Sequence, residues 1–419
     1  MIAPANFRNR KIIFPLCYVL CIIALDACKA KKEIIRNPDK VEVKDSVTKT
    51  EVKIEEPQIK KMDSVNITLF MPFSFEEYLA PVTETDDAQT MATQTANALS
   101  FYEGFRLAID SLGNNKMIWN IQSFDSMRDS ILVESQLKLN ETYDCDLLIT
   151  QLQSPFNTSA IKAFNDKKCK MIGISQAPPF APANSFYCLP SNANMIKSAS
   201  DHIAEKHGKN HIISLYKASS SKEKELSFLF QKNILAANHS IAITQFAYDE
   251  KNKDSLISNL SKTKTNLIIM ATSDESFVTS VFVKLVPEKE KYKIDVFGMP
   301  TWEHFESIDF KLLEEMHTTI FTSQFINYDS DEVTRFRKCY ISNYYSEPSY
   351  QAFMGFYLAS GLCSLMDDHG KDYWKYLNST NDNMSSNIFK IKSAGANLSF
   401  TNDKIFILSY SNYQLKITK

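Results

Sequence analysis

Polar and aromatic side chains follow the short apolar runs that predict β-strands in this 419-residue chain. Amide, hydroxyl and carboxylate groups placed there can hydrogen-bond a small polar molecule, and an aromatic ring can cover its apolar part. Parallel strands would bring such residues together, because ligands bind outside the carboxyl ends of the strands. The candidate ligand-binding residues are Phe73, Ser74, Asp125, Gln151, Gln153, Ser154, Ser175, Gln176, Tyr216, Ser273, Asp274 and Trp302, with Pro72, Lys217, Pro300 and Thr301 beside them. For any one of them the alternative is an ordinary loop or core position.

Motifs for catalysis and metal binding are missing from the sequence. It contains no GxSxG, HExxH or Walker-type motif, and none of its 9 glycines forms a GxG pair. His207 and His211 are four residues apart, but Gly208 interrupts the helix that would place them on one face. Adjacent carboxylates such as Asp367 and Asp368 do not face each other on a helix. The sequence therefore predicts no enzyme, no cofactor and no metal site.

The amino-terminal residues predict export and lipidation. Three basic residues precede an apolar run over residues 12–25, which is short for a membrane span and typical of a signal peptide. The run ends in Leu25-Asp26-Ala27-Cys28, which resembles the lipobox of bacterial lipoproteins. That resemblance implies a signal peptide over residues 1–27 and a lipid on Cys28 that anchors the protein to a membrane. The alternatives are an ordinary cleaved signal and an uncleaved anchor.

Residues 28–63 carry many charges of both signs and no aromatic residue, so they predict a flexible tether that cannot bury a core. The formal net charge of −2 offers no basic face for nucleic acid. Beyond the tether the chain holds five cysteines, an odd number without a CxxC spacing. We expect them to be buried thiols, and one disulfide is possible in an exported protein. These cysteines are Cys145, Cys169, Cys188, Cys339 and Cys363.

Apolar runs alternate with apolar residues at helical spacing from residue 66 onward. After a polar loop through about residue 95, the first half predicts helices at 98–112, 131–139 and 159–165 between strands at 66–71, 117–124, 146–149, 170–174 and 186–189. The pattern restarts after Pro190, with helices between strands at 211–216, 241–246, 266–270, 294–297 and 318–322. Two helices at 332–345 and 352–366 and a strand-like tail at 388–415 follow. This alternation predicts two α/β units in tandem, each a parallel sheet covered by helices.

This order of elements resembles the type I periplasmic binding proteins, best known as leucine/isoleucine/valine-binding proteins. Phe101–Asp110 is similar to the family's first helix, and Val296–Trp302 to a late strand of its second lobe. Residues 336–365 are similar to the closing helix pair, and the resemblance spans residues 66–415. More narrowly, the chain resembles Bacteroidetes lipoproteins that pair this fold with peptidoglycan-binding LysM modules, although no LysM segment is visible.

The resemblance implies an α/β fold with two lobes, each a mostly parallel sheet flanked by helices, and a ligand between them. Lobe one is expected at 64–190 plus 325–380, and lobe two at 191–324 plus 381–419. One turn departs from the family: Thr150-Gln151 stand where the amino-acid binders have Gly-Pro near the ligand carboxylate. The missing glycine restricts the backbone there, while Ser154 keeps a hydroxyl in the family's position.

These features predict a non-catalytic, membrane-anchored solute-binding lipoprotein that closes on a small polar ligand, amino-acid-like or other. A transporter or a sensor would be its partner. The alternative is an envelope lipoprotein that acts on peptidoglycan or its synthases and keeps only a vestigial cleft, because some outer-membrane lipoproteins that activate such synthases resemble this fold. Both hypotheses place the protein in the bacterial cell envelope, with its globular part in the periplasm or on the outer face of the outer membrane.

Overall fold

The computed structural model describes most of the chain beyond the expected tether. The described residues are 61–74, 86–111, 117–126, 135, 144–151, 169–178, 181–249, 251–252, 254–379, 388–395 and 397–418. The expected signal peptide, Cys28, nearly all of the tether, Gln153 and Ser154 lie outside them. So do the helix expected at 159–165 and all but one residue of the helix expected at 131–139. No described helix is long and apolar enough to span a bilayer.

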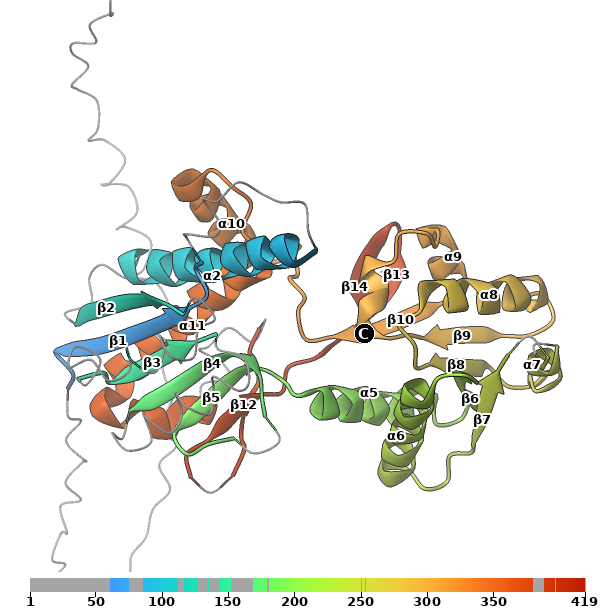
Figure 1. Cartoon of the computed structure of the whole chain (residues 1–419). Coiled ribbons are helices and arrows are strands. Elements are labelled where there is room, and N and C mark those ends of the chain that lie inside the picture. Colours follow the sequence, from blue (N-terminus) through green and yellow to red (C-terminus); the bar gives the residue numbers. More distant parts are fainter. Residues whose placement is uncertain are drawn as a thin grey trace, which may run out of the picture. The chain divides into compact units, whose positions relative to one another are not determined.

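The strands form two sheets, and the first of them, sheet A, has the order β11-β12-β5-β4-β3-β1-β2 (Figure 1). Neighbouring strands from β2 to β12 run parallel, and β11 pairs with β12 antiparallel. The strands are β1 (Ser64–Met71), β2 (Ile118–Asp125), β3 (Leu147–Thr150), β4 (Lys170–Gln176), β5 (Ser185–Leu189), β11 (Ile391–Ser393) and β12 (Phe400–Asn402). Four helical segments share a hydrophobic core with this sheet: α2 (Asp86–Ser111), α10 (Asp331–Tyr344), α11 (Tyr350–His369) and the 3-10 helix η4 (Gly370–Ser379).

The second sheet, sheet B, has the order β14-β13-β10-β9-β8-β6-β7. Its parallel part, β7-β6-β8-β9-β10, repeats the order of β2-β1-β3-β4-β5 in sheet A, and β13 and β14 add an antiparallel edge. The strands are β6 (His211–Lys217), β7 (Ile243–Tyr248), β8 (Asn266–Met270), β9 (Ile294–Phe297), β10 (Thr318–Thr322), β13 (Phe406–Ser411) and β14 (Gln414–Ile417). The helices are α5 (Asn192–His207), α6 (Ser221–Ala237), α7 (Ser255–Ser258), α8 (Glu275–Leu285) and α9 (Phe310–Glu315), with 3-10 helices η2 (Val286–Glu288) and η3 (Pro300–His304).

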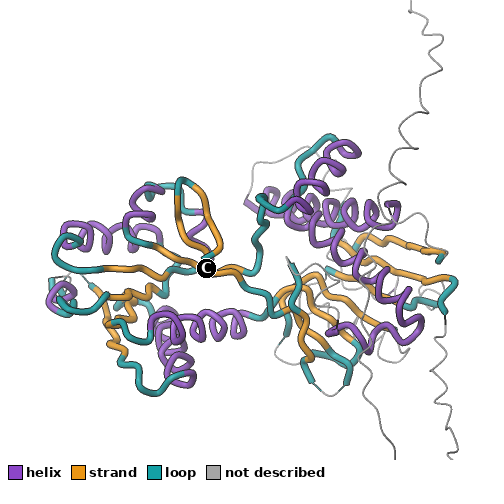
Figure 2. Tube along the Cα trace, turned by 180° about the vertical axis from the view of Figure 1, so that it is seen from behind, coloured by secondary structure: helices purple, strands orange, loops and turns teal. Residues whose placement is uncertain are grey.

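Apolar residues on both faces of the strands build the core. All five residues of β8 are buried, as expected of a strand that helices cover on both sides. Ile268 and Met270 face a cluster that includes Phe282 of α8, while Leu267 and Ile269 face a cluster that includes residues of α5 and α6. Figure 2 shows helices beside the strands in each half. The predicted α/β class with two mostly parallel sheets is confirmed.

Two expectations about element positions differ from the structure. Helix α2 begins at Asp86, inside the stretch that was expected to be a loop through residue 95. Ala92, Thr93 and Ala96 are exposed, so the first turns of the helix carry no apolar periodicity that a sequence pattern could show. The tail after residue 380 was expected in lobe two, but β11 and β12 pair in sheet A and β13 and β14 in sheet B. The chain therefore passes from one sheet to the other after Asn402, because β12 finds its partner in β5.

Helices α2 and α11 pack backbone against backbone at two glycines. A Cβ atom on Gly104 would lie 1.9 Å from the carbonyl oxygen of Ala352, and one on Gly355 would lie 2.2 Å from that of Phe101. Real Cβ contacts are never that short, so the close approach of the two helices requires glycine at both positions. Gly104 lies in the segment that resembles the family's first helix, and its role here is packing.

We expect Gly104→Ala to lower the free energy of unfolding by about 1–3 kcal/mol, because the added methyl group must push two packed backbones apart. Chemical denaturation of the purified protein measures this. Ala96→Ser adds one heavy atom on an exposed position of the same helix and should change stability by less than about 0.5 kcal/mol. Equal effects of the two substitutions would contradict the close packing at Gly104.

Candidate functional site

Each sheet has a point where successive connections leave in opposite directions, and ligands of open α/β sheets bind at the carboxyl ends of strands at such points. In sheet B, β6 lies between β7 and β8, so the point is at the ends of β6 and β8. In sheet A it is at the ends of β1 and β3. The carboxyl ends of β6 and β8 form the carboxyl edge of sheet B, and those of β1 and β3 form the carboxyl edge of sheet A.

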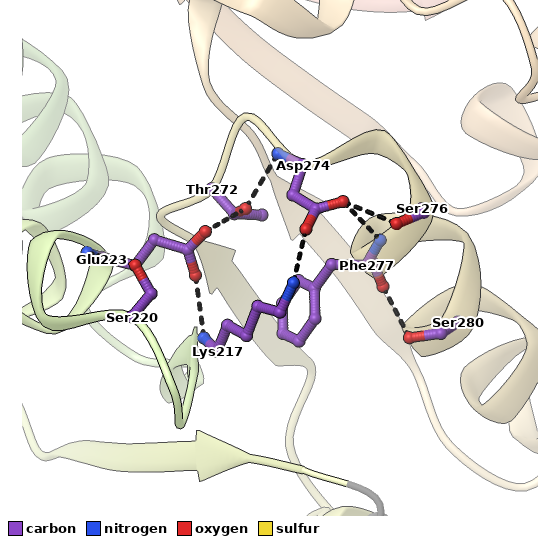
Figure 3. Close-up of polar contacts among 8 residues, drawn as sticks. All are labelled: Lys217, Ser220, Glu223, Thr272, Asp274, Ser276, Phe277 and Ser280. Carbon is purple, nitrogen blue, oxygen red and sulfur yellow. Dashed lines mark hydrogen bonds and ion pairs between the residues drawn. The ribbon is translucent and has the colours of Figure 1, made fainter.

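A charged pair lies at the edge of sheet B (Figure 3). Lys217 ends β6, and Asp274 is the residue that caps the start of α8. The Nζ atom of Lys217 is 2.7 Å from Oδ2 of Asp274, and the two side chains are 42% and 32% exposed. The bond from Lys217 lowers the pKa of Asp274 to about 2, with further help from Ser276 and the backbone N–H of Phe277. The carboxylate in turn raises the pKa of Lys217.

Glu223, in the first turn of α6, joins the ends of the two strands. Its carboxylate accepts hydrogen bonds from the backbone N–H of Lys217, at 2.9 Å, and from the hydroxyl of Thr272, at 2.6 Å. The same Thr272 oxygen accepts a bond from the backbone N–H of Asp274, at 3.0 Å (Figure 3). A charged acceptor between two strand ends is worth more than a neutral one, and here it fixes the backbone on both sides of the Lys217–Asp274 pair.

Two hydroxyls and a buried indole complete this edge. Ser273 and Thr301 are exposed, and the Thr301 hydroxyl donates to Oγ of Ser273 at 2.9 Å. Trp302 is only 1% exposed, and its ring N–H donates to the carbonyl of Thr272 at 2.8 Å. The backbone carbonyl of Trp302 accepts the hydroxyl of Tyr410 at 3.0 Å. Trp302 was a candidate to supply an apolar face to a ligand, with a core position as the alternative. The structure places it in the core, where it supports the loop after β8.

The edge of sheet A contains fewer exposed polar groups. Phe73 and Ser74, after β1, are 5% and 4% exposed, and Ser74 has a φ of 46°. The ring of Phe73 packs edge-to-face on Tyr102 with centroids 6.2 Å apart. These two residues follow their strand as the sequence predicts, but their side chains belong to the core in this structure.

Four other candidates at sheet A keep some exposure. Asp125, Gln151 and Ser175 are half-buried at the ends of β2, β3 and β4. Gln176 is exposed and donates from its amide to Oδ1 of Asn192 at 3.0 Å. Tyr216, at the sheet B edge, is 8% exposed and adds no open polar surface. The structure thus brings Lys217, Ser273, Asp274 and Thr301 to one edge, and the other described candidates lie along the strand ends of the two sheets.

Glu223 and Thr272 were not among the candidates. Thr272 comes two residues after the end of β8 and one residue before Ser273, so the strand-end rule could have included it. Ser220 and Glu223 form the S-x-x-E pattern of a capping box, and the Ser220 hydroxyl accepts the N–H of Glu223 at 3.3 Å. That pattern marks the start of α6, but it does not indicate that the Glu223 carboxylate accepts hydrogen bonds from Lys217 at the end of β6 and from Thr272 after β8.

No protein-family model matches the chain, and no curated protein matches it. Several solved structures, however, are similar to the chain. An ABC transporter substrate-binding protein from Desulfitobacterium hafniense in complex with Leu is 12% identical, with a TM-score of 0.52, and the match covers 85% of this chain and 100% of that one. A putative branched-chain amino acid ABC transporter from Rhodospirillum rubrum is 11% identical, with a TM-score of 0.58 and the same coverage.

A third match is full-length LpoA from Haemophilus influenzae, 13% identical with a TM-score of 0.51, covering 86% of this chain and 60% of that one. Together these likenesses show that the chain has the type I periplasmic-binding-protein fold. They confirm the predicted resemblance at the level of the fold, and a fold by itself does not determine a ligand. The narrower resemblance to proteins with LysM modules stays a prediction.

The Lys217–Asp274 pair generates a prediction about pH. Lys217→Met should raise the pKa of Asp274 from about 2 toward its ordinary value of 3.8, because the largest cause of the lowering is removed. In the unaltered protein the stability from this carboxylate is complete above pH 3.8 and is lost as the pH falls through 2. In the variant the folded and unfolded pKa values lie closer together, so the carboxylate contributes less stability and less is lost at low pH. Carboxyl NMR titration measures the change.

The matched control is Lys284→Met, which removes a lysine that pairs with Asp254 at 2.9 Å elsewhere on the same lobe. It should leave the titration of Asp274 unchanged. The same Asp274 titration in the Lys217→Met variant as in the unaltered protein would contradict the pairing.

Proposed function

We propose that this chain is a non-catalytic solute-binding lipoprotein of the bacterial cell envelope, which binds a small polar molecule at the carboxyl edges of its two sheets. The observation that carries the proposal is the partly exposed Lys217–Asp274 pair at the ends of β6 and β8, beside the hydroxyls of Ser273 and Thr301. The fold supports it, because open α/β sheets bind ligands at this place.

The charges of the pair favour a solute that carries both signs or strong dipoles. An exposed ion pair contributes little to stability because water screens its charges, so little is lost when a ligand separates its members. A carboxylate of the ligand can then contact Lys217, and an amino group can contact Asp274, each through a charge-assisted hydrogen bond. A zwitterionic or amide-rich solute fits this arrangement, and one of the matched structures holds Leu.

Residues of lobe one would complete the site. In the proposal, Asp125, Gln151, Ser175 and Gln176 supply polar groups from sheet A. Gln153 and Ser154, which follow Gln151 in the sequence, belong to the same proposed set. Phe73, Ser74, Tyr216 and Trp302 act as buried supports of the two edges. The lobes close on the ligand by a hinge motion, and a transporter or sensor then meets the closed form.

A catalytic role at this edge is disfavoured by the state of its carboxylates. Asp274 has a pKa of about 2, far below the range in which a carboxylate is an effective general base at neutral pH. Both oxygens of Glu223 accept hydrogen bonds from the protein. Among the described residues no group of three or more His, Cys, Asp or Glu side chains is placed to hold a metal ion.

The second candidate function is an envelope-interaction lipoprotein that acts on peptidoglycan or its synthases. The burial of Phe73 and Trp302 favours it, because neither aromatic candidate offers an open ring to a small ligand in this structure. The likenesses to solved structures concern the fold alone, and one fold can serve either role.

Thermal-shift titration of the mature chain against amino acids, short peptides and muropeptides separates the two functions. A ligand that binds the folded state alone stabilises it by about 2.7 kcal/mol at one hundred times its dissociation constant. Asp274→Asn keeps a good helix cap but removes the charge, so the affinity for a responding solute should fall about 10- to 100-fold. Asp254→Asn is the control and should leave the affinity unchanged.

No stabilisation by any amino acid or peptide, together with a response to muropeptides, would favour the second function. Equal affinity of the Asp274→Asn variant and the unaltered chain for the solute would show that the binding site does not lie at the carboxyl edge of sheet B.

Lipid anchoring has its own test. Cys28→Ser should release the protein into the soluble fraction of the exporting cell, because the only proposed attachment is the lipid on that cysteine. Cell fractionation with intact-mass analysis measures both location and modification. Cys339→Ser, at an exposed cysteine of α10, should stay with the membrane. Membrane association of the Cys28→Ser variant would contradict the lipoprotein assignment.

A further inference from the structure

Two cysteines lie together at the amino ends of neighbouring strands of sheet A. Cys145 comes two residues before β3, and Cys169 comes directly before β4. Strands β3 and β4 are parallel and in register at Leu147 and Lys170, and the N–H of Lys170 donates to the carbonyl of Asp146 at 3.2 Å. This pairing brings the sulfur atoms of Cys145 and Cys169 to 3.4 Å from each other, although 24 residues separate them in the chain. The site is at the opposite ends of the strands from the proposed ligand edge.

The surroundings of the two sulfurs differ. Cys169 is 7% exposed and packs in a cluster with Phe70, Leu148 and Met171. Cys145 is half-buried and lines a polar hollow of about 280 Å³ together with Thr68 and Asp144, among others. A thiol reagent or a partner thiol can therefore reach Cys145 first, and Cys169 lies behind it.

The pair also differs in its readiness to ionise. The hydrogen bond from the Cys169 thiol lowers the pKa of Cys145, whereas that interaction and burial raise the pKa of Cys169. Cys145 is thus the better nucleophile of the two, since the thiolate is the reactive form. Tyr373 lies close by with a hydroxyl that has no hydrogen-bond partner among the described residues, and its pKa is raised mainly by burial. An uncharged, apolar link between the sulfurs suits this environment better than a thiolate does.

We propose that Cys145 and Cys169 form a disulfide in the exported protein. The sulfurs must approach from 3.4 Å to about 2.05 Å. Side-chain rotation can supply this movement, because the two residues precede neighbouring parallel strands, which lie about 4.8 Å apart. The oxidant is another disulfide, carried by an oxidoreductase or a small thiol compound of the compartment. This inference rests on the proposed export of the protein and not on the identity of the ligand.

The exchange proceeds in two steps that balance. The Cys145 thiolate attacks one sulfur of the oxidant, which forms a mixed disulfide and releases one thiolate. Cys169 then loses its proton to that leaving thiolate or to solvent and attacks the Cys145 sulfur, which releases the second thiol. Two protein thiols are oxidised, and one external disulfide is reduced to two thiols.

The disulfide would link the amino ends of β3 and β4 and close the chain from residue 145 to residue 169. Such a link stabilises by restricting the unfolded chain, and loops of this size give a substantial effect. Cys188 and Cys363 are buried and Cys339 is exposed, and none of the three has a cysteine partner among the described residues.

Peptide mapping of the full chain, isolated from the membranes of an exporting bacterium without reductant, tests the proposal directly. N-Ethylmaleimide added under denaturing conditions should label Cys188, Cys339 and Cys363, and a linked peptide should join Cys145 to Cys169. Recovery of both Cys145 and Cys169 as maleimide adducts, or a link to any other cysteine, would overturn it.

A second measurement covers the case in which reduction or substitution alters folding. Dithiothreitol should lower the Tm of the unaltered protein by roughly 5–10 °C. It should have no effect on a Cys145→Ala/Cys169→Ala double variant, and Cys339→Ser should respond as the unaltered protein does. A Tm that is insensitive to reduction in the unaltered protein would also count against the disulfide.

Discussion

The carboxylate of Glu223 joins the ends of β6 and β8, and the arrangement of the candidate site depends on it. One oxygen accepts the backbone N–H of Lys217, and the other accepts the hydroxyl of Thr272. Thr272 in turn holds two other residues in place. Its hydroxyl oxygen accepts the backbone N–H of Asp274, and its backbone carbonyl accepts the indole N–H of Trp302. A single half-buried acid thereby sets the position of both members of the charged pair.

The two lobes share one strand order but carry different residues at the carboxyl ends of their strands. In lobe two the strand ends carry a charged pair and exposed hydroxyls. In lobe one the chain after β1 turns inward, with Phe73 against Tyr102 and Ser74 in a left-handed conformation. The strongest polar contacts of the described edges therefore come from lobe two, and lobe one contributes single amides, a hydroxyl and a carboxylate. A solute that binds here would be oriented mainly by lobe two.

The parts of the fold that depend on local pattern could be predicted from the sequence, and those that depend on tertiary partners could not. A uniformly apolar run such as residues 266–270 indicates a covered parallel strand, and the structure contains it. The start of α2 carries no apolar stripe, and the sheet to which β12 belongs is decided by a partner more than 200 residues away. The strand-end rule found Lys217, Ser273 and Asp274, because it needs only strand boundaries. It could not tell that Trp302 is buried, since the same residue type suits a core and a ligand site.

Hydrogen exchange of the mature chain tests most directly whether the carboxyl edge of sheet B binds a small polar solute. Exchange would be followed by mass spectrometry with and without a saturating mixture of amino acids, which is the probe for the proposed zwitterionic solute. We expect slower exchange in peptides that contain residues 217–223 and 272–277, because a bound ligand would hold the loops around Lys217 and Asp274. Unchanged exchange in those peptides, while peptides elsewhere become protected, would place the binding site outside this edge and contradict the proposed site.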